Sequence, residues 1–173
     1  IHFSSAGVLG SVSGGVPAEE SAPAGPINAY DRTKWAGEQA ALQAAAEGRN
    51  IIIIRPGWVY GPEDRRTFKL IKAVARRRII LATRGKALQT PVYIDDLIEG
   101  ILAAAEKGRS GEIYHLAGPE ALSVKEIINT IAGATGTSIP PIHLPLLPAR
   151  LGAVILEALF SPFGKEAAMQ IVN

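Results

Sequence analysis

Apolar residues along the chain form short continuous runs that alternate with segments of helical spacing. The clearest run covers residues 50–57, where four consecutive isoleucines are followed by Arg55, Pro56 and Gly57. A β-branched run that ends at Pro and Gly is typical of a parallel strand covered on both faces. Further strands are predicted at the other short runs, which are residues 2–5, 79–82, 92–94 and 112–116.

Helical spacing lies between these runs. It predicts four helices, at residues 29–47, 65–78, 95–107 and 123–132. Gly48 and Gly108 are expected to end the first and third helices, while Asp95 or Asp96 caps the third and Ser123 the fourth. Strands that alternate with helices predict an α/β fold with a parallel sheet.

Two segments do not follow this alternation of strands and helices. Residues 11–25 are rich in Ser, Gly and Pro, which predicts a loop that covers the mouth of a cofactor or substrate site. Residues 140–145 hold too many prolines for a helix, and after Pro148 apolar positions recur at helical spacing through Phe160. We interpret this last segment as a helix packed over the substrate region, with a hydrophobic lid or membrane-surface contact as the alternative.

Composition fits one domain with a real core, since the chain has 173 residues and 47% hydrophobic content. Its 18 basic and 16 acidic residues are nearly balanced, so no strong overall field is expected. Arg65, Arg66 and the run at residues 76–78 form a local basic stretch, which we interpret as a solvated helix face and C-terminal turn, with contact to phosphate as the alternative. These arginines are not interleaved with aromatic residues, which argues against nucleic-acid binding.

Cysteine is absent, which excludes disulfides and thiolate metal sites. His2, His115 and His143 show no ligand spacing, so no metal is expected. No apolar run reaches membrane-spanning length, and the default expectation is a cytoplasmic enzyme.

Tyr30 and Lys34 are the most informative pair, because they stand four residues apart on the first turns of a predicted helix. Side chains at this spacing share a helical face. Coulomb attraction to a lysine ammonium favours the phenolate form of a tyrosine, which can then exchange a proton with an alcohol or a ketone. The alternative is a half-buried ring beside a solvated lysine. Ser5, at the carboxyl end of a predicted strand, lies where open α/β sheets place ligands.

Five blocks of sequence with motif character follow one another over nearly the whole chain. They cover residues 3–10, 26–30 with Lys34, 55–62, 90–96, and 111–118 followed by 122–124. In this order they resemble the extended short-chain dehydrogenase/reductases, a family that includes NAD-dependent epimerases and dehydratases. The resemblance implies a partial Rossmann-like, doubly wound parallel sheet with a small C-terminal substrate-binding region.

The resemblance implies that Ser5, Tyr30 and Lys34 work together on a nicotinamide cofactor, either NAD or NADP. Ser5 would hydrogen-bond the substrate oxygen, and Tyr30 would be the general acid/base. Lys34 would favour the tyrosine phenolate and hold the nicotinamide ribose. The cofactor would carry out the hydride chemistry at a secondary alcohol or ketone carbon, while the protein supplies orientation and electrostatics.

Pro56, Gly57 and Trp58 would lie against the nicotinamide, so that with Tyr30 and Lys34 they form the expected cofactor-binding set. Members of the family often pair through the helix that bears the tyrosine, which implies a homodimer for the full-length protein.

Ser5, Gln89 and Tyr93 are the residues expected to contact a small-molecule substrate. Family members that act on nucleoside-diphosphate sugars have an asparagine where this chain has Trp58 and an arginine where it has Gln89. Both departures remove polar contacts, which favours a less polar substrate, as in the branch that resembles hydroxysteroid dehydrogenases and dihydroflavonol reductases. Sugar-nucleotide chemistry and a non-catalytic scaffold role remain the alternatives.

The chain lacks the Gly-rich turn that takes the cofactor pyrophosphate at a helix N-terminus in this family. Glycines at residues 7–10 and 13–15 are followed by Pro and acidic residues instead of a helix. We therefore expect an internal or C-terminal piece that does not hold NAD tightly and is inactive alone. Residues 1–62 are expected to be the C-terminal half of the cofactor domain, and residues 63–173 a mixed substrate-binding region with the remaining Rossmann strands.

Overall fold

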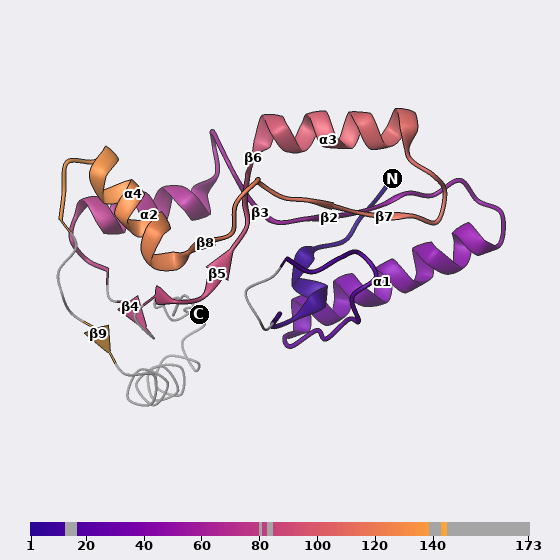
Figure 1. Cartoon of the computed structure of the whole chain (residues 1–173), viewed down its shortest axis with the longest axis horizontal. Helices are drawn as coiled ribbons and strands as arrows, with labels where there is room; N and C mark the ends of the chain where they lie inside the picture. The colour runs from indigo at the N-terminus through magenta and orange to yellow at the C-terminus, as the bar shows by residue number, and fades with distance from the viewer. Residues whose placement is uncertain (13–16, 80, 83–84, 139–142, 145–173) are drawn as a thin grey trace, which may run out of the picture. The chain divides into compact units, whose positions relative to one another are not determined.

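The computed structural model describes residues 1–12, 17–79, 81–82, 85–138 and 143–144 (Figure 1). The chain divides into two units and passes between them three times. The first unit combines Ile1–Asp64 with Gln89–Ala121, and the second combines Arg65–Leu88 with the chain from Leu122 onward.

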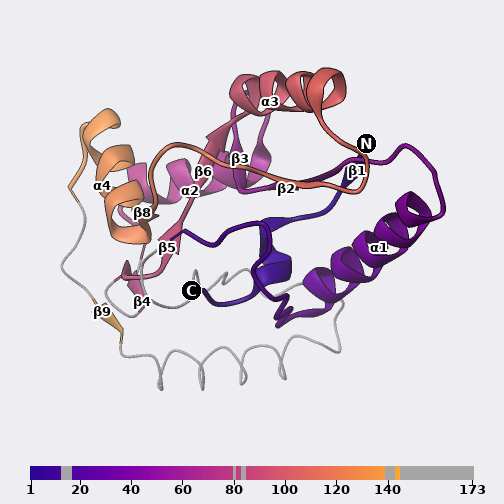
Figure 2. The ribbon, with the colours of Figure 1, turned by 45° about the vertical axis from the view of Figure 1, so that its right-hand side comes forward.

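A parallel sheet with the strand order β1-β2-β7 is the centre of the first unit. It consists of β1 (His2–Phe3), β2 (Ile53–Pro56) and β7 (Ile113–Leu116). Helix α1 (Ala29–Ala46) lies on one face of this sheet and α3 (Ile94–Lys107) on the other, as both ribbon views show (Figures 1 and 2). This arrangement confirms the predicted α/β fold with helices on both faces of a parallel sheet.

Side chains of the isoleucine run alternate between the two faces of the sheet. Ile52 and Ile54 are buried in a cluster with Ala104 of α3. Arg55 points the other way and meets α1 through Glu38. The predicted central strand is thus confirmed, with one apolar face and one face that carries a buried charge.

A second parallel pair continues from the end of β2. Strand β3 (Trp58–Tyr60) pairs with β6 (Pro91–Tyr93), which runs directly into α3. Between β2 and β3 the chain passes close to Thr90, because a Cβ atom placed on Gly57 would lie 2.4 Å from the Thr90 carbonyl oxygen. Any larger residue at position 57 would collide with this backbone.

After β1 the chain forms the short 3₁₀ helix η1 (Ala6–Leu9). It ends at Gly10, whose φ of 67° favours glycine. The Gly25 N–H donates to the Val8 carbonyl oxygen at 2.9 Å, which ties the end of the Ser- and Pro-rich segment to this helix.

The second unit is built on α2 (Arg65–Ala75) packed against α4 (Val124–Ala134). Its core contains the buried side chains Val74, Val124, Ile128 and Ala132. Two short strand pairs belong with these helices: β4 (Leu81–Ala82) with β9 (His143–Leu144), and β5 (Leu88–Gln89) with β8 (Leu122–Ser123).

Helix ends follow the predicted signals in most places. Ser123 caps α4 in a capping box with Glu126, and Gly48 follows α1 with a φ of 92°. Helix α2 ends at Ala75, three residues earlier than expected, because Arg77 adopts a left-handed φ of 55°. The N–H groups of Arg77 and Arg78 donate to the carbonyls of residues 74 and 73, which is the hydrogen-bond pattern of a Schellman motif.

One expected cap is wrong. Tyr93, in extended conformation, occupies the N-cap position of α3 without a side-chain hydrogen bond, and Asp95 and Asp96 lie within the first turn. There the two carboxylates still interact favourably with the helix dipole. The predicted helix after Pro148 lies outside the described residues.

Candidate active site

Tyr30 and Lys34 lie together at the start of α1, as their spacing predicts. Lys34 Nζ is 5.9 Å from the centre of the Tyr30 ring and donates a hydrogen bond of 3.1 Å to the carbonyl oxygen of Phe3. This bond fixes the ammonium at the carboxyl end of β1. The Tyr30 side chain is 59% exposed, so the ring is accessible rather than half-buried.

The first turn of α1 is held rigidly. Asn28 caps the helix, because its Oδ1 accepts the N–H of Asp31 at 2.9 Å and its amide nitrogen donates to the Asp31 carboxylate. Asp31 is buried, and its carboxylate lies so close to Gly7 that a Cβ atom there would be 2.3 Å away. The start of α1 therefore packs directly against η1.

Ser5 caps η1, and its Oγ accepts the N–H of Gly7 at 3.1 Å. Because α1 packs against this short helix, the structure places Ser5 in the same junction of β1, η1 and α1 as Tyr30 and Lys34. Within the described part of the chain, no hydrogen bond joins Ser5 to either of those two side chains.

The other predicted site residues follow the carboxyl ends of the parallel strands. Pro56 ends β2 and pairs with Leu116, and Trp58 begins β3. Gly57 is explained by its close approach to Thr90, a purely structural reason that is independent of any nicotinamide. Gln89 lies in β5, and Tyr93 packs edge-to-face on Tyr60 with the ring centres 5.6 Å apart.

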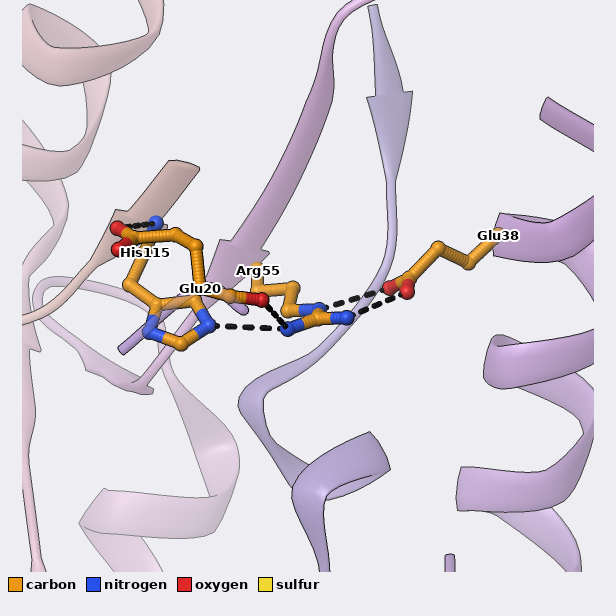
Figure 3. A network of polar contacts seen from close by, with 4 residues as sticks. All are labelled: Glu20, Glu38, Arg55 and His115. Carbon is orange, nitrogen blue, oxygen red and sulfur yellow. Dashed lines mark hydrogen bonds and ion pairs between the residues drawn. The ribbon is translucent and has the colours of Figure 1, made fainter. Parts of the chain in front are cut away.

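A buried ion pair connects the sheet to α1. Arg55 is 4% exposed and Glu38 is fully buried, and two hydrogen bonds of 2.9 Å and 2.6 Å join their side chains (Figure 3). Burial raises the pKa of Glu38, but the hydrogen bonds and charge of Arg55 outweigh this effect and hold the pKa below its usual value. Glu38 stands one helical turn after Lys34, so the pair anchors the helix that carries Tyr30 and Lys34.

The same guanidinium reaches the Ser- and Pro-rich segment. Arg55 Nη1 lies 3.2 Å from the Glu20 carbonyl oxygen and 3.2 Å from His115 Nε2. The His115 backbone N–H donates to Glu20 Oε1, and this bond lowers the pKa of Glu20. His115 Nδ1 lies 3.2 Å from the Ala18 carbonyl oxygen. These contacts tie residues 18–20 to the neighbouring strands β2 and β7 (Figure 3).

The five sequence blocks and this geometry agree with a comparison against known families. Residues 1–117 match the model of the NAD dependent epimerase/dehydratase family. The chain belongs to this family. Both the family and the partial Rossmann-like α/β fold that the five blocks imply are thereby confirmed.

Relatives within the family differ in what their names describe. A 4-hydroxy-2-methyl-3-oxo-4-farnesyl-3,4-dihydroquinoline-1-oxide ketoreductase of Stigmatella aurantiaca is 28% identical over 92% of this chain and 49% of its own length. A dTDP-4-dehydrorhamnose reductase of Mycolicibacterium smegmatis is 34% identical over 68% of this chain and 35% of its own length. The chain thus spans about half of the first relative and about a third of the second.

Among solved structures, the UDP-glucuronic acid 4-epimerase of Bacillus cereus in complex with NAD is 30% identical, with a TM-score of 0.74. The match covers 83% of this chain and 49% of that chain.

The contacts of Arg55 with Glu38, Glu20 and His115 are not among the features predicted from the sequence, although two features of the sequence point to the ion pair. Glu38 continues the spacing of Tyr30 and Lys34 by one more turn, and so shares their helical face. Arg55 is a charged residue inside an otherwise apolar strand, and charged residues are rarely buried unless they are paired.

Acidification is expected to destabilise the fold through His115. Burial lowers the pKa of this side chain. Its neutral form suits the site, with Nδ1–H donating to Ala18 and Nε2 accepting from Arg55, whereas a protonated ring would oppose the guanidinium. As the pH falls below the usual histidine value of about 6.5, the unfolded chain takes up a proton before the folded chain does, so stability decreases. Urea unfolding of the wild type and of His115→Gln between about pH 7 and pH 5 measures this effect.

Gln keeps an acceptor for Arg55 but does not titrate. The wild type should therefore lose more stability than His115→Gln over this range. Parallel pH profiles for the two proteins would contradict the role given to His115, because every other ionisable group is present in both.

Neither a metal centre nor a membrane span is seen in the described residues. No group of three or more His, Cys, Asp or Glu side chains among them could hold a metal ion. None of the described helices is long and apolar enough to cross a membrane.

Proposed function

We propose that the whole protein is an NAD(P)-dependent oxidoreductase of the epimerase/dehydratase type, with Tyr30 as its general acid/base. The observation that carries this proposal is the position of Lys34, beside the Tyr30 ring and hydrogen-bonded to the last residue of β1. Ligands of open α/β sheets bind outside the carboxyl ends of the strands. This location supports the proposal that the pair acts on a substrate alcohol beside a cofactor.

The side chains present fit a nicotinamide ribose. Lys34 Nζ carries three N–H donors and gives one to Phe3, which leaves two for ribose hydroxyls. The Tyr30 hydroxyl belongs to an exposed ring at the same junction. Bound NAD(P) would supply the hydride acceptor or donor.

Proton transfer is the step assigned to this chain. In the oxidation direction, the Tyr30 phenolate would accept the O–H proton of the substrate alcohol as its carbonyl group forms, and bound NAD(P) would be the acceptor of the hydride. The Lys34 ammonium stabilises the phenolate by Coulomb attraction. Ser5 Oγ accepts the Gly7 N–H, so its own O–H stays available to donate to the substrate oxygen.

We propose a substrate of low polarity as the first choice. Trp58 and Gln89 stand where sugar-nucleotide enzymes of the family would have asparagine and arginine, and the ketoreductase relative from Stigmatella is named for a farnesylated dihydroquinoline oxide that carries an oxo group. Sugar-nucleotide chemistry is the second choice, which the rhamnose-type reductase and the UDP-glucuronic acid epimerase favour. We also propose that the full-length protein is a homodimer.

Cofactor-dependent turnover tests this function. The whole protein should oxidise NADH or NADPH in the presence of an aromatic ketone such as a dihydroflavonol, and a thermal-shift panel with the same ketones and with UDP- and dTDP-sugars should show which class raises the melting temperature. Binding of neither cofactor, together with no turnover of either class, would leave a non-catalytic scaffold as the better account.

A further inference from the structure

The basic charge of this protein is concentrated in one stretch of the second unit. Residues 65–88 contain nine of the 18 lysines and arginines and none of the 16 acidic residues. The rest of the chain therefore carries an acidic excess, although the whole is almost neutral. A charge asymmetry of this kind indicates a surface for an anionic partner.

Helix α2 presents this charge together with apolar side chains. Val74 and Leu70 face inward and pack on the α4 cluster. On the outer side, Phe68 is 61% exposed and Ile71 is 36% exposed. We call the outer surface of α2 formed by Arg65, Phe68, Lys69, Ile71 and Lys72, all of them exposed, the α2 face.

Phe68 lies at the centre of the α2 face. Arg65 precedes it by three residues and Lys72 follows it by four, so a cation stands one helical turn away on each side. Ile71 also follows by three residues and extends the apolar strip. An apolar strip bordered by lysine and arginine is the pattern of a helix that lies at a membrane interface.

The charge pattern differs from that of an ordinary solvated helix. Within α2, Arg65 and Lys69 are like charges at the i,i+4 spacing, and such a pair destabilises a helix. Solvated helices usually relieve this repulsion with Glu or Asp at neighbouring positions, and α2 has neither. An external anion would provide the compensation that the helix itself lacks.

We propose that the α2 face docks on an anionic lipid bilayer. Phe68 and Ile71 would enter the headgroup region, and the cationic side chains of the face would contact lipid phosphates. An anionic bilayer suits both the apolar and the cationic side chains of the face. Burial of apolar area strengthens binding to the bilayer, and so does attraction between the cations and the anionic leaflet. Nucleic acid would use the cations only, because a single exposed ring offers little stacking.

Vesicle flotation of the whole protein tests this docking. Phosphatidylcholine vesicles with phosphatidylserine should bind the protein, and vesicles of phosphatidylcholine alone should not. Two paired substitutions, Phe68→Ser with Ile71→Ser and Lys69→Glu with Lys72→Glu, should each reduce binding at least about tenfold, and added salt should weaken binding of the wild type.

Matched controls lie on α3, where Leu102 is 58% exposed and Lys107 is also exposed. Leu102→Ser and Lys107→Glu should bind vesicles like the wild type, and melting curves should show that every variant is folded. Absent binding to anionic vesicles, equal binding to neutral ones, or loss of binding in neither α2 pair would overturn the proposal. Binding to an oligonucleotide without binding to vesicles would overturn it as well and would assign the face to nucleic acid.

Discussion

Replacing Glu38 with alanine is expected to reduce the free energy of unfolding by about 3–5 kcal/mol. The substitution leaves the Arg55 guanidinium, which is 4% exposed, without the carboxylate that neutralises it. Its remaining partners are the backbone carbonyl of Glu20 and the ring of His115, and neither supplies a negative charge. Domains of this size are stabilised by only about 5–15 kcal/mol, so a loss of this magnitude is visible in a urea titration.

Two further variants make the interpretation specific. The double substitution Glu38→Leu with Arg55→Met removes both charges and should cost less than Glu38→Ala alone, because no unpaired ion stays buried. Glu99→Ala, at an exposed position of α3, should change stability by less than about 0.5 kcal/mol. If Glu38→Ala were as mild as Glu99→Ala, the ion pair would have no structural role.

This ion pair also connects the fold to the candidate chemistry. Glu38 is on the helix that carries Tyr30 and Lys34, and Arg55 is on the central strand. Two parallel hydrogen bonds restrict both the rotation and the sliding of α1 on the sheet. A weakened pair should therefore displace Tyr30 and Lys34 even at temperatures where the protein stays folded.

The parts of the fold that could be predicted are those in which a local pattern decides the structure. Four consecutive isoleucines form a strand only if both faces are covered, and β2 is indeed the central strand. Gly48 and Ser123 mark helix ends through their own backbone and side-chain chemistry.

The short strands β3, β5, β8 and β9 could not be predicted, because pairing with distant residues creates them. Strand β3 has three residues, too few for a periodicity, and its partner Pro91–Tyr93 is far along the chain. Strands β5, β8 and β9 have two residues each and were missed for the same reason. The division into two units has no local signal either, because each unit is built from two separate segments of the chain.

The candidate site shows the same contrast. Helical spacing alone places Lys34 beside Tyr30, and the structure has them together. The contact between Glu20 and His115 joins residues 95 positions apart, so no local pattern could reveal it. The basic stretch was predicted as a solvated helix face, and the exposure of Phe68 within it became evident only from the packing of α2 on α4.

Tyr30→Phe is expected to lower turnover of the whole protein by about 10²–10⁴-fold, the range that a positioned general acid/base contributes. Stability should hardly change, because Tyr30 is 59% exposed and its hydroxyl makes no hydrogen bond within the described residues. The Phe ring would still offer its face to Lys34 Nζ, now 5.9 Å from the ring centre. Turnover with NAD(H) or NADP(H), and a melting curve for each protein, measure the two effects separately.

Tyr114→Phe is the matched control for this loss of a hydroxyl group. Tyr114 lies in β7 on the face that packs against α3, where its hydroxyl accepts the backbone N–H of Arg109. Removing that bond should cost some stability and leave turnover unchanged, the opposite of the outcome for Tyr30→Phe. If the Tyr30→Phe protein turned over like the wild type, the phenol would be excluded from proton transfer, because the substitution removes the hydroxyl group and leaves the rest of the site in place.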